Sequence, residues 1–189
     1  MPNVEYRGMN LIVPDNDSEW REYLKAVREH RLVMRKCAAC GLLRYPPNRG
    51  CPWCSNLGWS WQEVSGKGTI HSYEIVAQAI QPGFRDWAPY PVVVVDLDEQ
   101  RGRPTQDEGL RMVANLVTPD FTPEREENVA IGQRVRVLFQ DLSPEIALPQ
   151  FTLTGEPPRG PRLAPALDPF GALKLGLDCL IKYIYSSSN

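Results

Sequence analysis

The chain has 189 residues, of which 42% are hydrophobic and 23% are charged, and its formal net charge at pH 7 is -2. This composition is typical of a globular protein with one ordinary domain and a small additional module. The near-neutral charge excludes a global electrostatic attraction to nucleic acid or to anionic membranes. No apolar run reaches the ~20 residues that a membrane-spanning helix needs, so no membrane segment is predicted.

Residues 1–30 are predicted to be an N-terminal helical segment. The first residues contain neither a basic nor an apolar signal region, which argues against export and predicts a cytoplasmic protein. Several helix N-cap candidates occur at 15–18, and an apolar stripe with helical spacing follows them. We expect this stripe to be buried, either on the body of the protein or against a partner. The candidates for a partner interface in this helix are Trp20, Tyr23 and Leu24.

The most informative feature of the chain is a set of four cysteines, which form two C-x-x-C pairs separated by ten residues: Cys37, Cys40, Cys51 and Cys54. Each pair directs two sulfurs to one point, and two such pairs folded together make the tetrahedral thiolate site that Zn²⁺ prefers. We therefore predict a zinc ribbon over residues 31–58. Four sulfurs close the coordination shell, so the zinc is expected to be structural rather than catalytic. Two disulfides or an iron–sulfur cluster are the alternatives.

The ribbon segment carries five cations and no Asp or Glu. A zinc ion with four thiolates has a formal charge of -2, so the loaded module has a balance of about +3. Two interpretations remain open. The cations either offset the thiolates or form a surface that faces phosphate groups.

Residues 59–154 are predicted to be all-β. The segment alternates apolar and polar residues, is rich in β-branched and aromatic side chains, and bends at Gly66 and Gly68. Four or five strands in roughly 100 residues predict a small closed barrel, and the OB-fold is the best candidate. The expected strands are a first strand over 59–76 that bends at its glycines, then 89–97, 110–117 and 132–139, with 151–154 as the candidate fifth.

Residues 155–189 are predicted to be a proline-rich linker followed by an amphipathic helix. Apolar residues recur there at spacings of three and four, starting from Phe170. A helix this short must dock on something, either its own barrel or another subunit. Cys179 in this helix is expected to be a small buried hydrophobe. The partner-interface candidates in this helix are Leu173, Leu177, Leu180 and Ile184.

These segments together resemble the acyl-CoA-associated zinc-ribbon/OB-fold proteins, a family long catalogued as a domain of unknown function. The cysteine spacing is shared by many ribbons, whereas its combination with the Val-Ser-Gly-x-Gly-Thr segment is much more specific. The resemblance covers 18–154 and rests on 32–41, Tyr45-Pro46-Pro47, 51–54, 63–73, 89–92 and 132–135.

The resemblance implies a mainly β fold in the order just described and a non-catalytic accessory subunit of a thiolase-fold enzyme. Such a complex would be a hetero-oligomer acting on acyl-CoA by thiolytic or retro-aldol cleavage or by acyl transfer. Zinc is the implied cofactor, and a CoA ester is a possible ligand. The polar insertion at 101–107 and the extension after Gly155 depart from the family pattern and leave the subfamily and the partner open.

Under this resemblance, basic and aromatic side chains are candidates for contacts with the phosphates and the adenine of CoA. The aromatic members could equally be core or interface residues. The candidates are Arg35, Arg44, Arg49, Phe84, Trp87 and Tyr90.

Two other functions compete with this interpretation. Ribbons and OB-folds also bind nucleic acid, but acids and bases are interleaved along 59–154 and leave no basic track. A self-sufficient enzyme would need a catalytic group, and no Ser-His-acid or Cys-His grouping is visible around the only histidines, His30 and His71. No catalytic residue is predicted.

Overall fold

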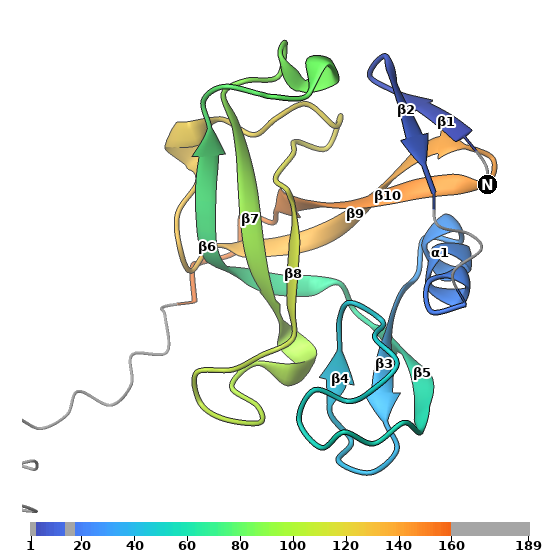
Figure 1. Cartoon of the computed structure of the whole chain (residues 1–189). Coiled ribbons are helices and arrows are strands. Elements are labelled where there is room, and N and C mark those ends of the chain that lie inside the picture. The colour runs from blue at the N-terminus through green and yellow to red at the C-terminus, as the bar shows by residue number, and fades with distance from the viewer. Residues whose placement is uncertain (1–2, 14–17, 160–189) are drawn as a thin grey trace, which may run out of the picture.

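A computed structural model of the chain describes residues 3–13 and 18–159 (Figure 1). Within these residues the architecture is mainly β with one α-helix, which confirms the predicted fold class. The strands form a two-stranded hairpin, a three-stranded sheet and a five-stranded sheet. The predicted C-terminal helix lies outside the described residues, together with its predicted interface residues Leu173, Leu177, Leu180 and Ile184 and with Cys179.

The chain begins with a β-hairpin, β1 (Asn3–Tyr6) and β2 (Met9–Ile12), that the sequence analysis did not predict. Its two-residue turn places Arg7 and Gly8 at φ values of 54° and 71°. Positive φ at both central residues is the type I′ geometry that matches the twist of paired strands. Strands of four residues are too short to show a clear alternation, so the turn was the only available signal.

Helix α1 (Arg21–Arg28) confirms the predicted amphipathic helix. Its buried residues are Tyr23, Ala26 and Val27, and they lie in the same core cluster as residues of the two larger sheets. The apolar stripe therefore packs on the body of this chain. No helix among the described residues is long and apolar enough to span a membrane.

The zinc-ribbon segment forms a small antiparallel sheet in the order β4-β3-β5. Register pairs Arg35 of the central strand with Arg44 on one side and Trp61 on the other. This pairing puts the two arginines and the tryptophan side by side, at the end of the sheet nearest the cysteines. The strands are β3 (Leu32–Cys37), β4 (Leu43–Arg44) and β5 (Trp59–Val64).

The five-stranded sheet has the order β10-β9-β6-β7-β8 and curls until its two edges meet at a Leu116–Phe151 bridge. This is the five-stranded, partly open barrel typical of the OB-fold. Short 3₁₀ turns occupy Pro82–Phe84 (η1), Asp98–Gln100 (η2) and Glu126–Asn128 (η3). The strands are β6 (Lys67–Val76), β7 (Tyr90–Leu97), β8 (Arg111–Asn115), β9 (Arg134–Ser143) and β10 (Ile146–Leu153).

Strand β6 starts at the predicted glycine bend, where Gly68 and Thr69 pair with β9 on one side and with β7 on the other, and the rest of the strand pairs with β7 alone. A Cβ at Gly68 would lie 2.7 Å from the backbone oxygen of Asp96, which only glycine avoids. The bend therefore lets β6 form hydrogen-bonded ladders with strands in both halves of the barrel.

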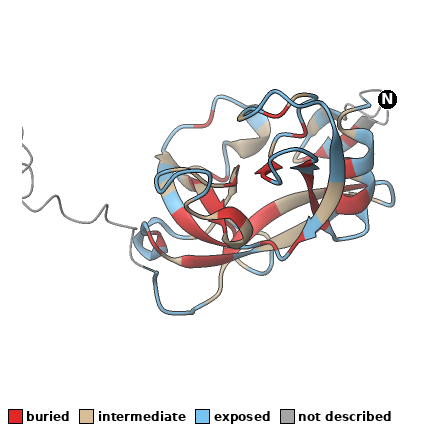
Figure 2. Ribbon diagram, turned by 90° about the horizontal axis from the view of Figure 1, so that it is seen from below, coloured by how far each residue is buried: buried red, intermediate tan, exposed pale blue. Residues whose placement is uncertain are grey.

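One continuous core fills the barrel and extends to the helix and the ribbon sheet (Figure 2). Val93, Val95 and Leu97 of β7 are fully buried at its centre. Met34 of β3 and Val27 of α1 belong to the same cluster. Ribbon and barrel are therefore joined by apolar packing.

Candidate metal centre

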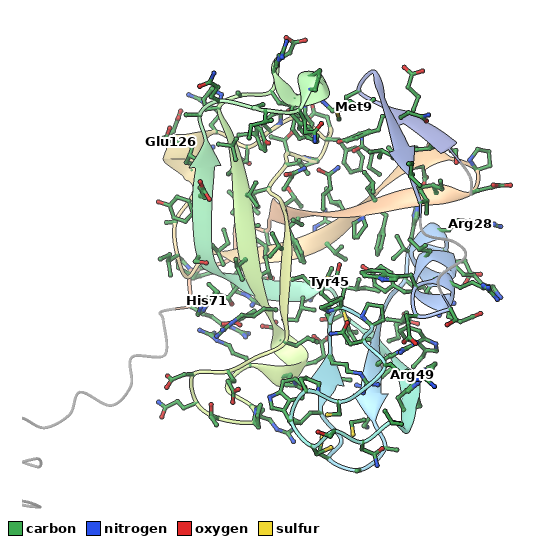
Figure 3. The ribbon with its side chains drawn as sticks, in the orientation of Figure 1. Met9, Arg28, Tyr45, Arg49, His71 and Glu126 are labelled. Atoms are coloured by element: carbon green, nitrogen blue, oxygen red, sulfur yellow. The ribbon has the colours of Figure 1, made fainter. Side chains whose placement is uncertain are left out.

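The four predicted cysteine ligands come together at the free end of the ribbon (Figure 3). Their sulfur atoms all lie within 4.8 Å of one another, with Cys37–Cys54 at 3.5 Å and Cys40–Cys51 at 3.6 Å. Zn–S bonds of about 2.3 Å in a tetrahedron imply sulfur–sulfur distances of about 3.8 Å, so the donor set fits zinc. The same distances are much longer than a disulfide bond of about 2.05 Å.

The two C-x-x-C turns have equivalent backbone geometry. In each, the N–H four residues after the first cysteine donates to that cysteine's carbonyl: Gly41 to Cys37 at 3.0 Å and Ser55 to Cys51 at 2.9 Å. Both donors have positive φ, 71° for Gly41 and 59° for Ser55. Glycine adopts this conformation freely, whereas Ser55 adopts it at some cost in free energy. The repeated turn aims each pair of sulfurs at one point.

Backbone N–H groups favour the thiolate form of Cys37, whereas at Cys40 and Cys54 the backbone hydrogen bonds are outweighed by burial and the neighbouring sulfurs, which raise the pKa of both thiols. Hydrogen bonds from the N–H of Cys40, and then from that of Ala39, lower the pKa of the Cys37 thiol to about 6. A thiolate is the form that ligates a metal. When bound, zinc supplies a structural cross-link and leaves no coordination position for a substrate.

The predicted phosphate-facing arginines are mostly internal. Arg35 is only 2% exposed. Its guanidinium lies over the Trp59 ring at 3.9 Å, forms an ion pair with Glu19, and donates to the Asn48 carbonyl at 3.1 Å. Arg35 therefore connects the start of α1, the loop between the cysteine pairs and β5.

Arg44 is also 2% exposed and holds the same loop. It donates to the carbonyls of Asn48 at 2.9 Å and Arg49 at 3.1 Å. These contacts leave Arg44 and Arg35 facing inward, whereas Arg49 faces solvent. Of the three arginines, Arg49 is the one placed to meet a ligand at the surface.

The predicted aromatic contacts lie between η1 and the first residue of β7, at the end of the barrel opposite the ribbon (Figure 1). Phe84, Trp87 and Tyr90 contact one another, with ring centroids 5.4–6.1 Å apart. The Arg7 guanidinium of the N-terminal hairpin lies over Trp87 at 4.2 Å, and Trp87 is only 8% exposed. The hairpin therefore already occupies the face of Trp87 that stacking on adenine would need.

The helix residues predicted as a partner interface form an internal aromatic contact with the ribbon. The ring centroids of Trp20 and Tyr23 lie 5.4 Å apart, and Tyr45 lies 5.7 Å from Tyr23. Trp20 and Leu24 are partly buried against the core, and Tyr23 is part of it. Because these side chains already pack within this chain, little of the apolar stripe remains exposed for contact with a partner.

The 3₁₀ turn η2 ties the ribbon to the barrel, a role that was not predicted from the sequence. The Gln100 side chain is buried and pairs with both backbone groups of Leu43, accepting from N–H at 2.5 Å and donating to C=O at 2.9 Å. Its neighbour Glu99 accepts from the N–H of Ser65, between β5 and β6, at 2.6 Å. The Gln100 amide thus makes the pair of hydrogen bonds that a neighbouring strand would make with Leu43. No local sequence pattern identifies a glutamine with this role.

Replacing Gln100 with Ala should lower the free energy of unfolding by about 2–3 kcal/mol, because it leaves the buried N–H and C=O of Leu43 without partners. Urea unfolding measures this change. Hydrogen exchange at the Leu43 amide should become faster in the same variant. Gln106→Ala, at an exposed position, is the matched control and should change little. Equal stability of the two variants would contradict this role of Gln100.

The two histidines occupy different settings. His71 lies at a β-bulge of β6, with Nδ1 3.2 Å from Asp96, which also accepts from Arg111 Nε at 2.7 Å. The hollow of about 390 Å³ beside His71 is lined by no Ser or Cys among the described residues. His30 is exposed, lies 2.8 Å from Asp141 and stacks on Phe139. Thr69 also lines the hollow beside His71, and Ser143 lines the hollow that contains His30 and Asp141.

Two family models match the chain. Residues 24–59 match the rubredoxin-like zinc ribbon domain of ChsH2, and residues 61–140 match the C-terminal OB-fold domain of ChsH2. Their meeting point near residue 60 lies in β5, which belongs to the ribbon sheet and leads into the barrel.

Several known proteins are similar over most of the described chain. A probable enoyl-CoA hydratase alpha subunit from Thermomonospora curvata is 35% identical over 129 residues. The alignment covers 68% of this chain but only 35% of that longer protein. A DUF35 domain-containing scaffold protein from Methanothermobacter thermautotrophicus is 30% identical over 119 residues, covering 62% of this chain and 78% of that protein.

A solved structure titled Ltp2-ChsH2(DUF35) aldolase contains a chain that aligns with a TM-score of 0.58 and 31% identity. The alignment covers 72% of this chain and 95% of that one. Sequence and structure thus agree on one relationship over both the ribbon and the barrel. The chain belongs to the DUF35 family, with the zinc ribbon and OB-fold domains of ChsH2.

Proposed function

We propose that this chain is a non-catalytic, zinc-stabilised accessory subunit of a thiolase-fold enzyme that acts on acyl-CoA substrates. The observation that carries this proposal is the alignment over 95% of a chain in the solved structure of the Ltp2-ChsH2(DUF35) aldolase. The subunit contributes to assembly of a hetero-oligomer and to access of the acyl-CoA, while the partner supplies the reacting groups for thiolytic or retro-aldol cleavage or acyl transfer.

The geometry of this chain supports a structural rather than a catalytic role. Its metal centre has four sulfur donors, which close the shell of a zinc ion. His71, the histidine beside a hollow of about 390 Å³, has its Nδ1 directed at Asp96 and no Ser or Cys among the residues that line that hollow. A CoA ester that reaches this chain would meet Arg49 as the exposed arginine of the loop between the cysteine pairs.

The test is affinity purification of the tagged full chain from its native host, with mass spectrometric identification of what co-elutes. We expect a thiolase-superfamily subunit in near-stoichiometric amount, together with acyl-CoA cleavage or transfer activity that the isolated chain lacks. Absorbance at 260 nm on the same fraction reports bound nucleic acid. Co-elution of nucleic acid without a thiolase-superfamily protein would overturn the proposal in favour of a nucleic-acid-binding module.

A further inference from the structure

The ribbon buries two guanidinium groups side by side. Arg35 and Arg44 are Cα partners on neighbouring strands, each is 2% exposed, and both donate to the carbonyl of Asn48, at 3.1 and 2.9 Å. The ribbon segment has no Asp or Glu, and the carboxylate that pairs with Arg35 is that of Glu19, from outside the segment. Arg35 Nε and Arg44 Nη1 are buried without a hydrogen-bond acceptor among the described residues. Two adjacent buried cations need more negative charge than one carboxylate supplies.

Arg35 lies on the buried side of the metal centre. Of the four cysteines, Cys37 and Cys51 are buried and the other two are exposed. Arg35 precedes Cys37 by two residues on β3, so both side chains project from the same face of the strand. The Arg35 guanidinium covers the ring of Trp59, which is the Cα partner of Cys37, at 3.9 Å. The positive charge of Arg35 is therefore held next to the first buried ligand.

Arg44 stands in a similar relation to the second buried ligand. It donates to the carbonyl of Arg49 at 3.1 Å, two residues before Cys51 in the chain. One buried arginine thus accompanies each buried cysteine. A zinc ion with four thiolates has a formal charge of -2. Water screens this charge on the exposed side, whereas on the buried side the dielectric is lower and the compensating charge must come from the protein.

We propose that Arg35 and Arg44 are the counterions of the metal centre, and that their positive charge raises the affinity of the ribbon for zinc. Of the two interpretations that the sequence leaves open for the cations of the ribbon, this one assigns these two to the thiolates. The inference concerns the metal centre of the isolated chain and holds whether or not the proposed accessory function does. The competing explanation is that the arginines only fix the loop between the cysteine pairs by their hydrogen bonds.

The experiment measures the zinc affinity of the full chain by competition with a chelator. Arg44→Gln keeps an N–H donor for the loop carbonyls but removes the charge, and it should weaken zinc binding about 10–100-fold. Arg44→Lys keeps the charge but loses the forked pair of hydrogen bonds, and it should stay within about fivefold of wild type. Arg49 is exposed on the same loop, so Arg49→Gln is the matched control and should change the affinity by less than about threefold.

The order of the two Arg44 variants separates charge from hydrogen bonding. If Arg44→Lys loses zinc as readily as Arg44→Gln, the hydrogen bonds to the loop decide the affinity and the inference is overturned. Equal effects of Arg49→Gln and Arg44→Gln would overturn it as well, because burial would then be irrelevant. Should Arg44→Gln fail to fold in excess zinc, Arg44→Lys decides by itself: near wild-type affinity supports the inference, and lost affinity overturns it.

Cobalt(II) in place of zinc gives a readout that a purely structural role would not move. Its ligand-field absorption reports the tetrahedron of four sulfurs, and its sulfur-to-metal charge-transfer band reports the electrostatic potential at the thiolates. Removing a nearby positive charge raises the energy of the sulfur electrons, so this band should move to longer wavelength in Arg44→Gln while the ligand-field absorption is unchanged. Arg44→Lys and Arg49→Gln should keep the wild-type spectrum. An unmoved charge-transfer band in Arg44→Gln would contradict the counterion role.

Discussion

Replacing Cys40 with Ala should reduce bound zinc from about one ion per chain to a small fraction of that, with at least a 100-fold loss of affinity. Three sulfurs remain within reach of one another, but they leave the shell open and the first C-x-x-C turn without its second ligand. Structural zinc in small modules contributes about 10–16 kcal/mol of folding free energy, so this is the largest effect that we expect from a single substitution.

The damage should be confined mainly to the ribbon. The loop between the cysteine pairs is held by Arg35 and Arg44, and it loses the metal cross-link beside those contacts. Hydrogen exchange should therefore accelerate over 37–58, whereas the barrel strands stay protected. Metal analysis by mass spectrometry gives the zinc content, and Cys179→Ala is the matched control. Full zinc content in Cys40→Ala would contradict four-sulfur ligation.

Replacing Arg134 with Met should lower the free energy of unfolding by about 3 kcal/mol at pH 7. Arg134 is 4% exposed, and its guanidinium donates to both carboxylate oxygens of Asp98, at 2.8 and 2.5 Å. It also donates to the Gly68 carbonyl at 2.7 Å, at the bend of β6. Methionine fills similar space but removes these donors, and it leaves Asp98, whose side chain is 24% exposed, with Arg159 at 3.2 Å as its cationic partner. Arg136→Met, at an exposed site on the same strand, is the control and should change stability by less than about 0.5 kcal/mol.

The effect of Arg134 should depend on pH. Burial alone would raise the pKa of Asp98, but the hydrogen bonds and charge of Arg134 outweigh it and hold that pKa below its usual value. The stabilisation that the Arg134–Asp98 pair gives the folded state is therefore fully present above the ordinary Asp pKa of about 4. It is lost as the pH falls through the lowered pKa of Asp98. Urea unfolding should show a constant difference between wild type and Arg134→Met from about pH 5 to 7. The difference should shrink below about pH 4. A difference that grows on acidification would contradict this account.

The features that the sequence predicted correctly are those with a local signature. The cysteine spacing was sufficient to predict the cluster of four sulfurs, because the turn geometry is set within five residues of each pair. The bend was predicted from the paired glycines Gly66 and Gly68, and the structure shows that a Cβ at Gly68 would meet the backbone of Asp96. Strands β7 and β9 were predicted from runs of apolar and alternating residues, and the helix stripe from its spacing.

The features that could not be predicted depend on residues distant in the chain. Whether Arg35 faces solvent depends on Trp59 and Glu19, which approach it from a later strand and an earlier segment. The availability of Trp87 depends on Arg7, about eighty residues before it, in a hairpin too short to recognise. Because of these contacts, side chains that were predicted to face a ligand pack inside the protein instead. A phosphate-facing surface and a set of buried cations have the same composition, and only the fold separates them.

The measurement that tests the central claim most directly is native mass spectrometry of the complex that the tagged chain brings out of its host. We predict a hetero-oligomer that contains this chain and a thiolase-superfamily subunit, with a mass that includes about one zinc ion per copy of this chain. A zinc-loaded chain that is always recovered without such a subunit would contradict the account of an accessory subunit.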